Sequence, residues 1–431
     1  MNVTTQVLRE LLVEAGVDQA VADVVRPDAP LLRQGVDSLD FPAFSLAVES
    51  RFDLAIGERD SLSLRTLDDF AAYIRQHLGG KPQVSPVERI RRDWRQIEPD
   101  RKYAIGPLKP GDGQGIAQLF YSVYGDRYPV EDYYVPESIE RLNAEGALLT
   151  VVARLESGAV AGQGAYYQSS PPNKALFEFG QLLVAPEYRN SLMVAKILKE
   201  MDRLSRTMAQ AQGFFGEAVC THLVTQKLVD KQGYAECGLE VSLMPAGAYE
   251  KEGAGAQRVS CLLGARVDRD HRMLLHLPEC YRQEMELILR GFSLDREISF
   301  SAMDAPLATE SSFDSRTFDF ASVERVQVAT VGSDFTDVVR TLDQDAKRRN
   351  LAVVQVFVNT GAPGAVFAVE ALRARGFVLG GLVPLWFGPD GLLMQKLYVE
   401  PEFHAINLFS DRSKELLAFI RADWDRARSL A

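Results

Sequence analysis

The chain has 431 residues, of which 46% are hydrophobic and 25% charged, and its formal net charge at pH 7 is −11. This length exceeds what one hydrophobic core usually supports, so we expect two to four domains in an ordinary soluble protein. The acidic balance argues against nucleic acid as a partner, because phosphate binding needs basic surface. No apolar run approaches the length of a membrane helix, and the N-terminal pattern is not that of a signal peptide, so we expect a cytoplasmic location.

Residues 1–80 have the pattern of four short helices. Apolar residues at helical spacing run up to Gly16, a further helix follows Ser38, and the last begins at the N-cap candidate Thr66. This segment holds 13 acidic and seven basic residues, so it carries much of the acidity of the chain. The glycines and prolines that follow predict a linker over residues 81–100.

From Tyr103 onward the pattern changes to alternating strands and helices. The strand "LFEFGQLLVA" leads into a long helix that Gly213 closes. Strand, long helix, strand and helix then recur in the second half, and each half next reaches a glycine–aromatic pair. The pattern therefore predicts two mixed-sheet domains in tandem, over residues 101–255 and 256–431.

Cysteine and histidine spacing gives no metal motif. The four cysteines are too scattered for a zinc knuckle and too few for a disulfide scaffold. His271 and His276 are five residues apart, which fits no helical pair of ligands. We therefore predict no metal site.

The stretch "GVDSLDFPAF" places a serine at the start of a helix. Ser38 has no local general base, which a catalytic serine needs. At a helix N-cap, however, its position suits a phosphodiester, because the helix N-terminus is partly positive. The nearby acidic residues Asp37, Asp40 and Glu49 would suit recognition by a basic transferase. The alternative is an ordinary N-capping serine in a helical bundle.

The same stretch resembles the attachment site of acyl carrier proteins, in which Asp-Ser-Leu precedes the second helix of a four-helix bundle. The resemblance covers the first 80 residues and implies a covalent 4′-phosphopantetheine on Ser38. It also implies two protein partners. A phosphopantetheinyl transferase would add the arm, and an acyl-loading enzyme, either an adenylating enzyme or a synthase, would charge it.

The stretch "FGQLLVAPEYRNSLMVAKIL" resembles the core of GNAT-fold N-acyltransferases, in which Val-x-Pro-x-x-Arg leads into a helix that holds the pyrophosphate of acetyl-CoA. Arg189 matches this pattern, but Leu192 and Val194 stand where the family has small residues, chiefly glycine, that admit a phosphate. A donor carried on an arm has no adenosine diphosphate to dock, so the glycines become dispensable. The residues implied to bind the donor arm or its phosphate are Leu183, Val184, Arg189, Asn190 and Ser191.

Two titratable residues are the main catalytic candidates of this GNAT-like domain. Glu178 lies where the fold frequently positions the base for the amine, although it equally fits a solvated strand face. His222, with Thr221 beside it, ends the next strand and is suited to protonate a leaving thiolate. Its alternative role is a strand-end histidine that bonds a backbone carbonyl. The tyrosine that the family often uses as the acid is replaced by Val229.

The resemblances together predict a four-helix carrier bundle followed by GNAT-like mixed-sheet domains in tandem, the second of them degenerate. The leading hypothesis is an N-acyltransferase of secondary metabolism that moves an acyl group from the arm on Ser38 to a small-molecule amine. One alternative is a loading or decarboxylating S-acyltransferase that charges the carrier from acyl-CoA. Another is a carrier with a non-catalytic docking platform.

Overall fold

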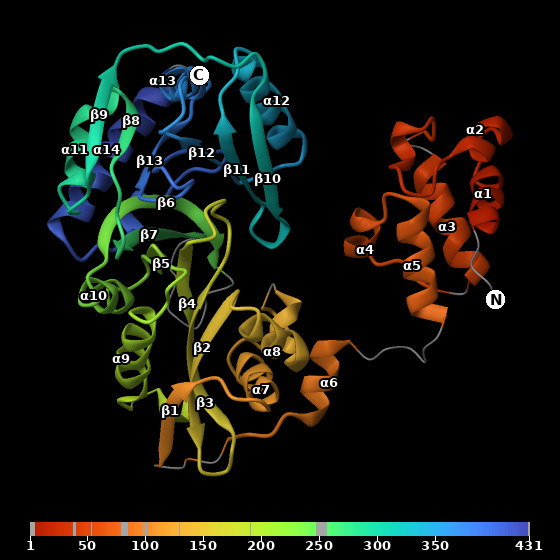
Figure 1. The fold of residues 1–431 in the computed structure, drawn as a ribbon, viewed down its shortest axis with the longest axis horizontal. Helices are drawn as coiled ribbons and strands as arrows, with labels where there is room; N and C mark the ends of the chain where they lie inside the picture. The colour runs from red at the N-terminus through yellow and green to blue at the C-terminus, as the bar shows by residue number, and fades with distance from the viewer. Residues whose placement is uncertain are drawn as a thin grey trace. The chain divides into compact units, whose positions relative to one another are not determined.

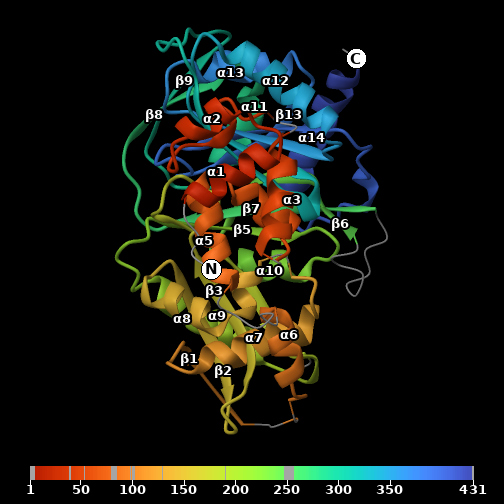
Figure 2. The ribbon, with the colours of Figure 1, turned by 90° about the vertical axis from the view of Figure 1, so that its right-hand side faces the viewer.

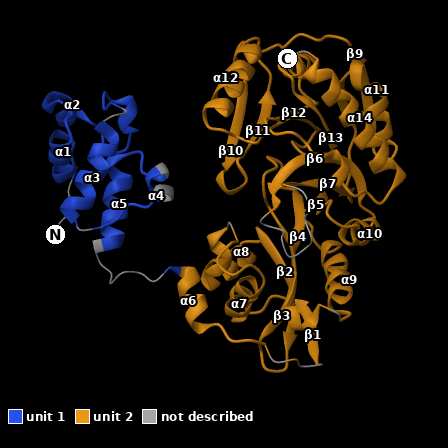
Figure 3. Cartoon of the chain, turned by 180° about the vertical axis from the view of Figure 1, so that it is seen from behind, with its two compact units in different colours: residues 1–85 blue, residues 86–431 orange. Residues whose placement is uncertain are grey.

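The computed structural model describes residues 5–37, 40–52, 54–78, 85–97, 99, 102–128, 130–189, 191–246 and 257–429. The predicted attachment residue Ser38 and the predicted donor-loop residue Asn190 lie outside these ranges. The chain forms two compact units, Met1–Ser85 and Pro86–Ala431 (Figure 3). No helix in the described part of the chain is long and apolar enough to cross a membrane.

The first unit is helical throughout its described residues. Its α-helices are α1 (Thr5–Glu14), α2 (Gln19–Val24), α3 (Asp40–Phe52), α4 (Glu58–Ser63) and α5 (Leu67–Leu78), with a 3-10 turn at Leu31–Arg33. Apolar residues at helical spacing meet in one core, where the rings of Phe44 and Phe70 pack edge to face with centroids 4.8 Å apart. The predicted helical bundle is therefore confirmed, although the two six-residue helices α2 and α4 make it less regular than expected.

The predicted N-cap of the last helix is present. The Thr66 hydroxyl accepts a hydrogen bond of 3.0 Å from the Asp69 amide, and the Asp69 carboxylate accepts one of 2.9 Å from the Thr66 amide. This reciprocal pair satisfies backbone donors that a helix start otherwise leaves unpaired. Burial desolvates the Asp69 carboxylate, but its hydrogen bonds with the Thr66 side chain and with the amides of Arg65 and Thr66 together hold the pKa of Asp69 below its usual value.

The described residues of the second unit form a twelve-stranded sheet and a small parallel pair (Figure 1). In spatial order the large sheet contains β1 (Tyr103–Pro107), β2 (Leu148–Leu155), β3 (Val160–Tyr167), β4 (Leu176–Val184), β5 (Gly213–Val219), β7 (Arg258–Val267), β6 (Ala235–Pro245), β13 (Val378–Val383), β14 (Gly391–Leu397), β12 (Val353–Asn359), β11 (Val323–Thr330) and β10 (Ser312–Phe318). The small pair is β8 (Met273–Pro278) with β9 (Arg296–Ser301).

Helices cover both faces of this sheet. They are α6 (Pro86–Asp93), α7 (Asp112–Tyr124), α8 (Pro136–Ala144), α9 (Met193–Ser205), α10 (Val224–Asp230), α11 (Arg282–Leu289), α12 (Phe335–Arg348), α13 (Ala365–Arg373) and α14 (Asp411–Arg428). Helix α9 lies on one side of β3, and α7 and α8 lie on the other (Figure 1). In the second half α14 lies beside β13 (Figure 2).

The two halves of the second unit repeat one topology. The order β3-β4-β5-β7-β6 in the first half has its counterpart in β10-β11-β12-β14-β13 in the second. In each half one central pair is parallel, β4 with β5 and β11 with β12, and the flanking pairs are antiparallel. The order of strands and helices that recurs in the sequence thus corresponds to a structural repeat.

The repeats join edge to edge through β6 and β13. Gly238 of β6 pairs with Gly381 of β13, which has a φ of 151°. A side chain on Gly381 would overlap the backbone of Cys237 and Gly238, so the close approach of these strands requires glycine there.

Two domain boundaries differ from those expected. Helix α6 lies inside the predicted linker 81–100 but belongs to the second unit, because its Ile90 is buried in the core of that unit. The expected boundary between residues 255 and 256 separates β6 from β7. Since β7 pairs with both β5 and β6, the first repeat continues to Val267.

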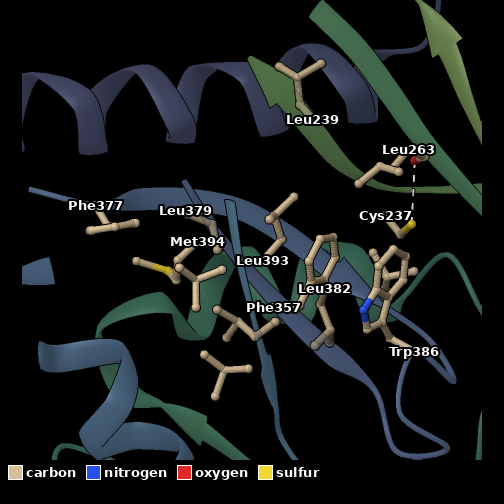
Figure 4. Close-up of a cluster of buried hydrophobic side chains, with 14 of the residues drawn as sticks. Cys237, Leu239, Leu263, Phe357, Phe377, Leu379, Leu382, Trp386, Leu393 and Met394 are labelled. Atoms are coloured by element: carbon tan, nitrogen blue, oxygen red, sulfur yellow. Dashed lines mark hydrogen bonds between the residues drawn. The ribbon is translucent and has the colours of Figure 1, made fainter. Parts of the chain in front are cut away.

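A single core spans the seam between the repeats. Trp386 stacks on Phe357 with centroids 3.9 Å apart, and its ring meets Phe215 of the first half edge-on at 5.2 Å. Figure 4 shows Phe357 and Trp386 in this cluster, together with Cys237 and Leu263 from β6 and β7. The second repeat therefore buries one side of the first.

Candidate functional site

Strands β4 and β5 open away from each other in the middle of the first repeat. They pair over only three positions, the last being Glu178 with Phe215. Beyond it β4 continues beside β3, and β5 continues beside β7. The register of β3 and β4 shifts near Gln181, a non-glycine residue with a φ of 53°. Such a bulge bends a strand, so it accounts for the opening between these two central strands.

Glu178 lies where this opening starts. It is half-buried and accepts a short hydrogen bond from the hydroxyl of Tyr167, its direct partner on β3. Burial and the neighbouring charge of Glu217 raise the pKa of Glu178 to about 7, against the opposing effects of Tyr167 and Arg325. The surroundings of Glu178 are therefore not those of a solvated strand face. A carboxyl group with this pKa is suited to accept a proton near neutral pH.

A polar cluster continues from Glu178 across the concave face of the sheet. Arg325 of β11 donates hydrogen bonds to Glu240 (2.7 Å), Glu217 (3.3 Å) and Gln355 (2.8 Å). Glu240 is fully buried and also accepts a bond of 2.7 Å from Gln355. Burial, followed by the charge of Glu217, raises the pKa of Glu240 to about 8. Two carboxyl groups, those of Glu217 and Glu240, thus share one guanidinium. The raised pKa values of Glu178 and Glu240 favour the protonated forms of these two groups relative to an ordinary glutamate.

Sheet curvature brings these residues together. Five strands stand between β5 and β11 in the hydrogen-bonding order. In a flat sheet the two strands would be roughly 29 Å apart, at about 4.8 Å per strand. Yet a guanidinium nitrogen of Arg325 on β11 lies 3.3 Å from a carboxylate oxygen of Glu217 on β5. The sheet must therefore curl around the cluster. The candidate site consequently receives residues from both repeats.

Sequence reasoning found only Glu178 in this cluster. The additional residues are Tyr167, Glu217, Glu240, Arg325 and Gln355. The available signal was a charged residue inside an otherwise apolar strand, as in "FFGEAV", "CGLEVSL" and "VERVQV". Buried charges need partners, so each such residue was a candidate for this cluster.

The predicted donor loop leads into helix α9 as expected. The Ser191 hydroxyl donates to the Tyr188 carbonyl (2.7 Å) and accepts from the Met193 amide (3.2 Å), so it caps the helix start. Arg189 is exposed, whereas Leu183 and Val184 are buried in the sheet core.

Leu192 and Val194, which replace small residues of the GNAT pattern, lie at the start of α9. Leu192 is 72% exposed directly before α9, and Val194 lies partly buried in its first turn. Both positions therefore carry a branched side chain where a phosphate would need close access to backbone amides.

Thr221 and His222 lie in the turn after β5. The Thr221 carbonyl accepts from Asn407 (3.3 Å), and the half-buried His222 accepts through its carbonyl from Gln226 (3.3 Å). The hydroxyl oxygen of Thr221 is buried without a hydrogen-bond partner among the described residues. Glu178 pairs beside Phe215, and β5 continues for four more residues before this turn, roughly 13 Å at about 3.3 Å per residue. The two catalytic candidates thus lie at different levels of the same opening.

The corresponding region of the second repeat is filled by its own chain. Ala308 forms a bridge with Gly332 in the loop after β11, and the Ser311 hydroxyl bonds to the Gly332 amide at 3.0 Å. At the start of α13, in the stretch "NTGAPGA", the Asp304 carboxylate accepts from the amides of Gly364 and Phe367. A carboxylate of the protein therefore occupies this glycine-rich turn.

No group of three or more histidine, cysteine or acidic side chains suited to hold a metal ion occurs among the residues with described positions. The cluster around Arg325 does not resemble such a site, because the guanidinium already supplies the positive charge.

The N-terminal unit is similar to proteins of known type. Residues 6–74 match the phosphopantetheine attachment site family. Over 69 residues the chain is 36% identical to the acyl carrier protein of Bdellovibrio bacteriovorus, which corresponds to 16% of this chain and 85% of that relative. Through this unit the chain belongs to the acyl carrier protein family. Ser38 falls within the matched residues, between the exposed Asp37 and the start of α3 at Asp40, a position that fits an attachment residue.

Part of this carrier-containing chain, 38% of its length, is similar in fold to solved GNAT-family structures. The GNAT-family acetyltransferase of Streptococcus pneumoniae is 12% identical, and the match covers 38% of this chain and 99% of that one, with a TM-score of 0.33. The N-acetyltransferase of Staphylococcus aureus is 13% identical, with coverages of 38% and 98% and a TM-score of 0.31. The spermidine/spermine N-acetyltransferase of Vibrio cholerae is 15% identical, with coverages of 38% and 92% and a TM-score of 0.30.

Proposed function

We propose that this protein is an N-acyltransferase that uses its own acyl carrier unit as the donor and a small-molecule amine as the acceptor. The observation that carries the proposal is Glu178, a carboxyl group with a pKa of about 7 at the point where β4 and β5 separate, in a chain that also has a carrier unit. Intact mass spectrometry of the acylated chain, before and after addition of an amine, tests it.

The attached arm supplies the acyl group as a thioester. The acceptor amine attacks the carbonyl carbon, a C–N bond forms, and the C–S bond breaks to give an amide and a thiol. Glu178 takes the proton that the amine loses, because its carboxylate is present at and above neutral pH. The β4 backbone near Leu183 and Val184 would line the donor, in the manner of a peptide at a strand edge.

His222 is proposed to donate the proton that the leaving sulfur needs. It is half-buried at the far end of the β4–β5 opening, on the turn that Asn407 of the second repeat supports. The Thr221 hydroxyl beside it, which has no hydrogen-bond partner among the residues with described positions, is proposed to donate to the acyl oxygen. The amine nitrogen and the leaving sulfur are bonded to one carbon in the tetrahedral intermediate, whereas the two candidates lie at levels of β5 roughly 13 Å apart, at about 3.3 Å per residue. Glu178 is therefore proposed to take the amine proton through intervening water, with His222 near the sulfur.

Replacement of His222 by alanine is expected to lower the single-turnover transfer rate by roughly 10²–10⁴-fold, the usual range for loss of a general acid. Rapid-quench measurement of amide formation from the acylated chain gives this rate. His276→Ala is the matched control, since His276 is also half-buried but lies on strand β8 of the second repeat. Equal rates for wild type and His222→Ala would remove His222 from the mechanism.

Covalent delivery accounts for the altered donor loop. A tethered donor reaches an effective concentration of the order of millimolar, so tight binding of its phosphate is not needed. Leu192 and Val194 can then replace small residues at the start of α9.

Free acetyl-CoA is accordingly expected to bind weakly, with a dissociation constant well above the micromolar range. Titration calorimetry on the full chain, before the arm is attached, measures this. Low-micromolar affinity would mean that the loop at Arg189–Val194 accepts a pyrophosphate after all, and would favour the alternative below.

The second candidate is an S-acyltransferase that loads or decarboxylates an acyl unit and charges the carrier from acyl-CoA. The pairing of Thr221 with His222, and the unpartnered Thr221 hydroxyl, favour it. Appearance of an acyl mass on the carrier after addition of acyl-CoA, without any loading enzyme, distinguishes it. In the leading proposal a separate adenylating enzyme or synthase of a secondary-metabolite pathway loads the arm.

A further inference from the structure

We propose that Arg325, a residue of the second repeat, is a positioning residue for the proton acceptor Glu178 of the first. The proposal rests on the function proposed above for Glu178. It assigns the second repeat a role beyond packing, because the guanidinium that balances the acidic groups of the site comes only from β11.

The contacts of the Arg325 side chain fix the position and orientation of its guanidinium. The Arg325 side chain is 6% exposed, and its carbon centre lies 5.6 Å from the ring of Phe318 and 5.7 Å from that of Phe357. Its nitrogens bond to acceptors on β5, β6 and β12 and to Ser170 in the loop that precedes β4. A planar group with so many directed bonds has a single orientation.

Charge balance explains why this orientation matters for Glu178. Glu217 and Glu240 lie in the same cluster and, when ionised, oppose ionisation of Glu178. Arg325 pairs with both of them, so it offsets their charge and leaves Glu178 as the carboxyl group that faces the opening. The titratable or charged groups around Glu178 are Tyr133, Tyr167, Glu217, Glu240 and Arg325.

The location of Arg325 supports a role in the site rather than in local stability alone. Arg325 bridges two repeats that are joined in the sheet only at the β6–β13 edge. A second buried arginine, Arg296, pairs with Asp390 (2.8 Å) and Asp270 (2.7 Å) wholly within the second repeat. The Arg296 side chain is also buried in ion pairs. Its replacement therefore shows the effect of losing a buried ion pair in the absence of any effect on Glu178.

The test measures the titration of Glu178 without any need for transfer activity. The carboxylic acid C=O infrared band of the full chain is followed against pH, and the Glu178→Gln spectrum is subtracted. Loss of the positive charge in Arg325→Met is expected to raise the Glu178 midpoint by roughly one pH unit or more, the usual effect of a nearby opposite charge. Arg325→Lys should restore most of the shift, and Arg296→Met should leave the midpoint unchanged.

A second variant keeps the proposal testable if Arg325→Met does not fold. Glu217→Gln removes the carboxylate that opposes Glu178, so the midpoint should fall. An unchanged midpoint in a folded Arg325→Met protein, or in Glu217→Gln when that protein alone folds, overturns the inference. An absence of acyl transfer in the wild-type protein would instead overturn the proposed function, whatever the infrared titration gives.

Discussion

Replacement of Glu178 by glutamine is expected to slow acyl transfer from the carrier arm to an amine by roughly 10²–10⁴-fold, because the variant cannot accept the amine proton. Glutamine retains the shape of the side chain and can still accept the hydrogen bond from Tyr167. The fold should therefore persist, and the loss should lie in the transfer rate. Single-turnover kinetics with the acylated chain and excess amine measure it.

The pH dependence gives a sharper form of this prediction. Only ionised Glu178 is a base, and its pKa of about 7 means that the wild-type rate should rise as the pH increases through neutrality. Glu178→Gln should lack this rise, so its deficit relative to wild type should be larger above pH 7 than below it. At high pH, where the free amine becomes abundant, the rates of both proteins should increase.

A matched control is Glu324→Gln, which alters a buried carboxylate on β11 that is paired with Arg349. Asn359→Ala, at the end of β12, should likewise change stability more than rate. If either of these variants abolished transfer while Glu178→Gln remained near wild type, the active site would belong to the second repeat.

Replacement of Ser38 by alanine is expected to abolish attachment of the phosphopantetheine arm. The basis is the match of residues 6–74 to the attachment-site family and the position of Ser38 in the sequence, two residues before the start of α3 at Asp40. Incubation with a broad-specificity phosphopantetheinyl transferase and CoA should add the mass of one arm to the wild-type chain and nothing to Ser38→Ala.

Ser45 provides the control for this experiment, since it lies on α3 and its hydroxyl donates a hydrogen bond to the Phe41 carbonyl. Ser45→Ala should gain the arm normally. A Ser38→Ala protein that still gains the full mass of an arm would place the attachment elsewhere in the chain.

Local patterns in the sequence were sufficient to predict the longer helices and the strands. Apolar spacing and the Thr66 cap defined the last helix of the first unit, and the strand with Glu178 followed from its alternation. The repeat was also visible, because each half carries the same order of elements. The short helices α2 and α4 were missed, since six residues give too little periodicity to detect.

Long-range features could not be predicted in the same way. The contact between Arg325 and Glu217 depends on curvature accumulated over several strands, and no local pattern encodes that curvature. The boundary after residue 255 was misplaced for a related reason. The sequence of residues 246–256 is rich in glycine and alanine and suggested a domain break, but the following strand β7 returns to pair between β5 and β6.

The central claim is that the chain transfers an acyl group from its own arm to an amine. It is tested most directly by intact mass spectrometry of the acylated chain during a single turnover. The account predicts that the acyl mass disappears from the protein at the rate at which the amide appears. The rate should not depend on protein concentration, because donor and site share one chain. An acyl group that stays on the carrier, with no amide formed from any of a broad panel of small-molecule amines at neutral to mildly alkaline pH, would contradict it.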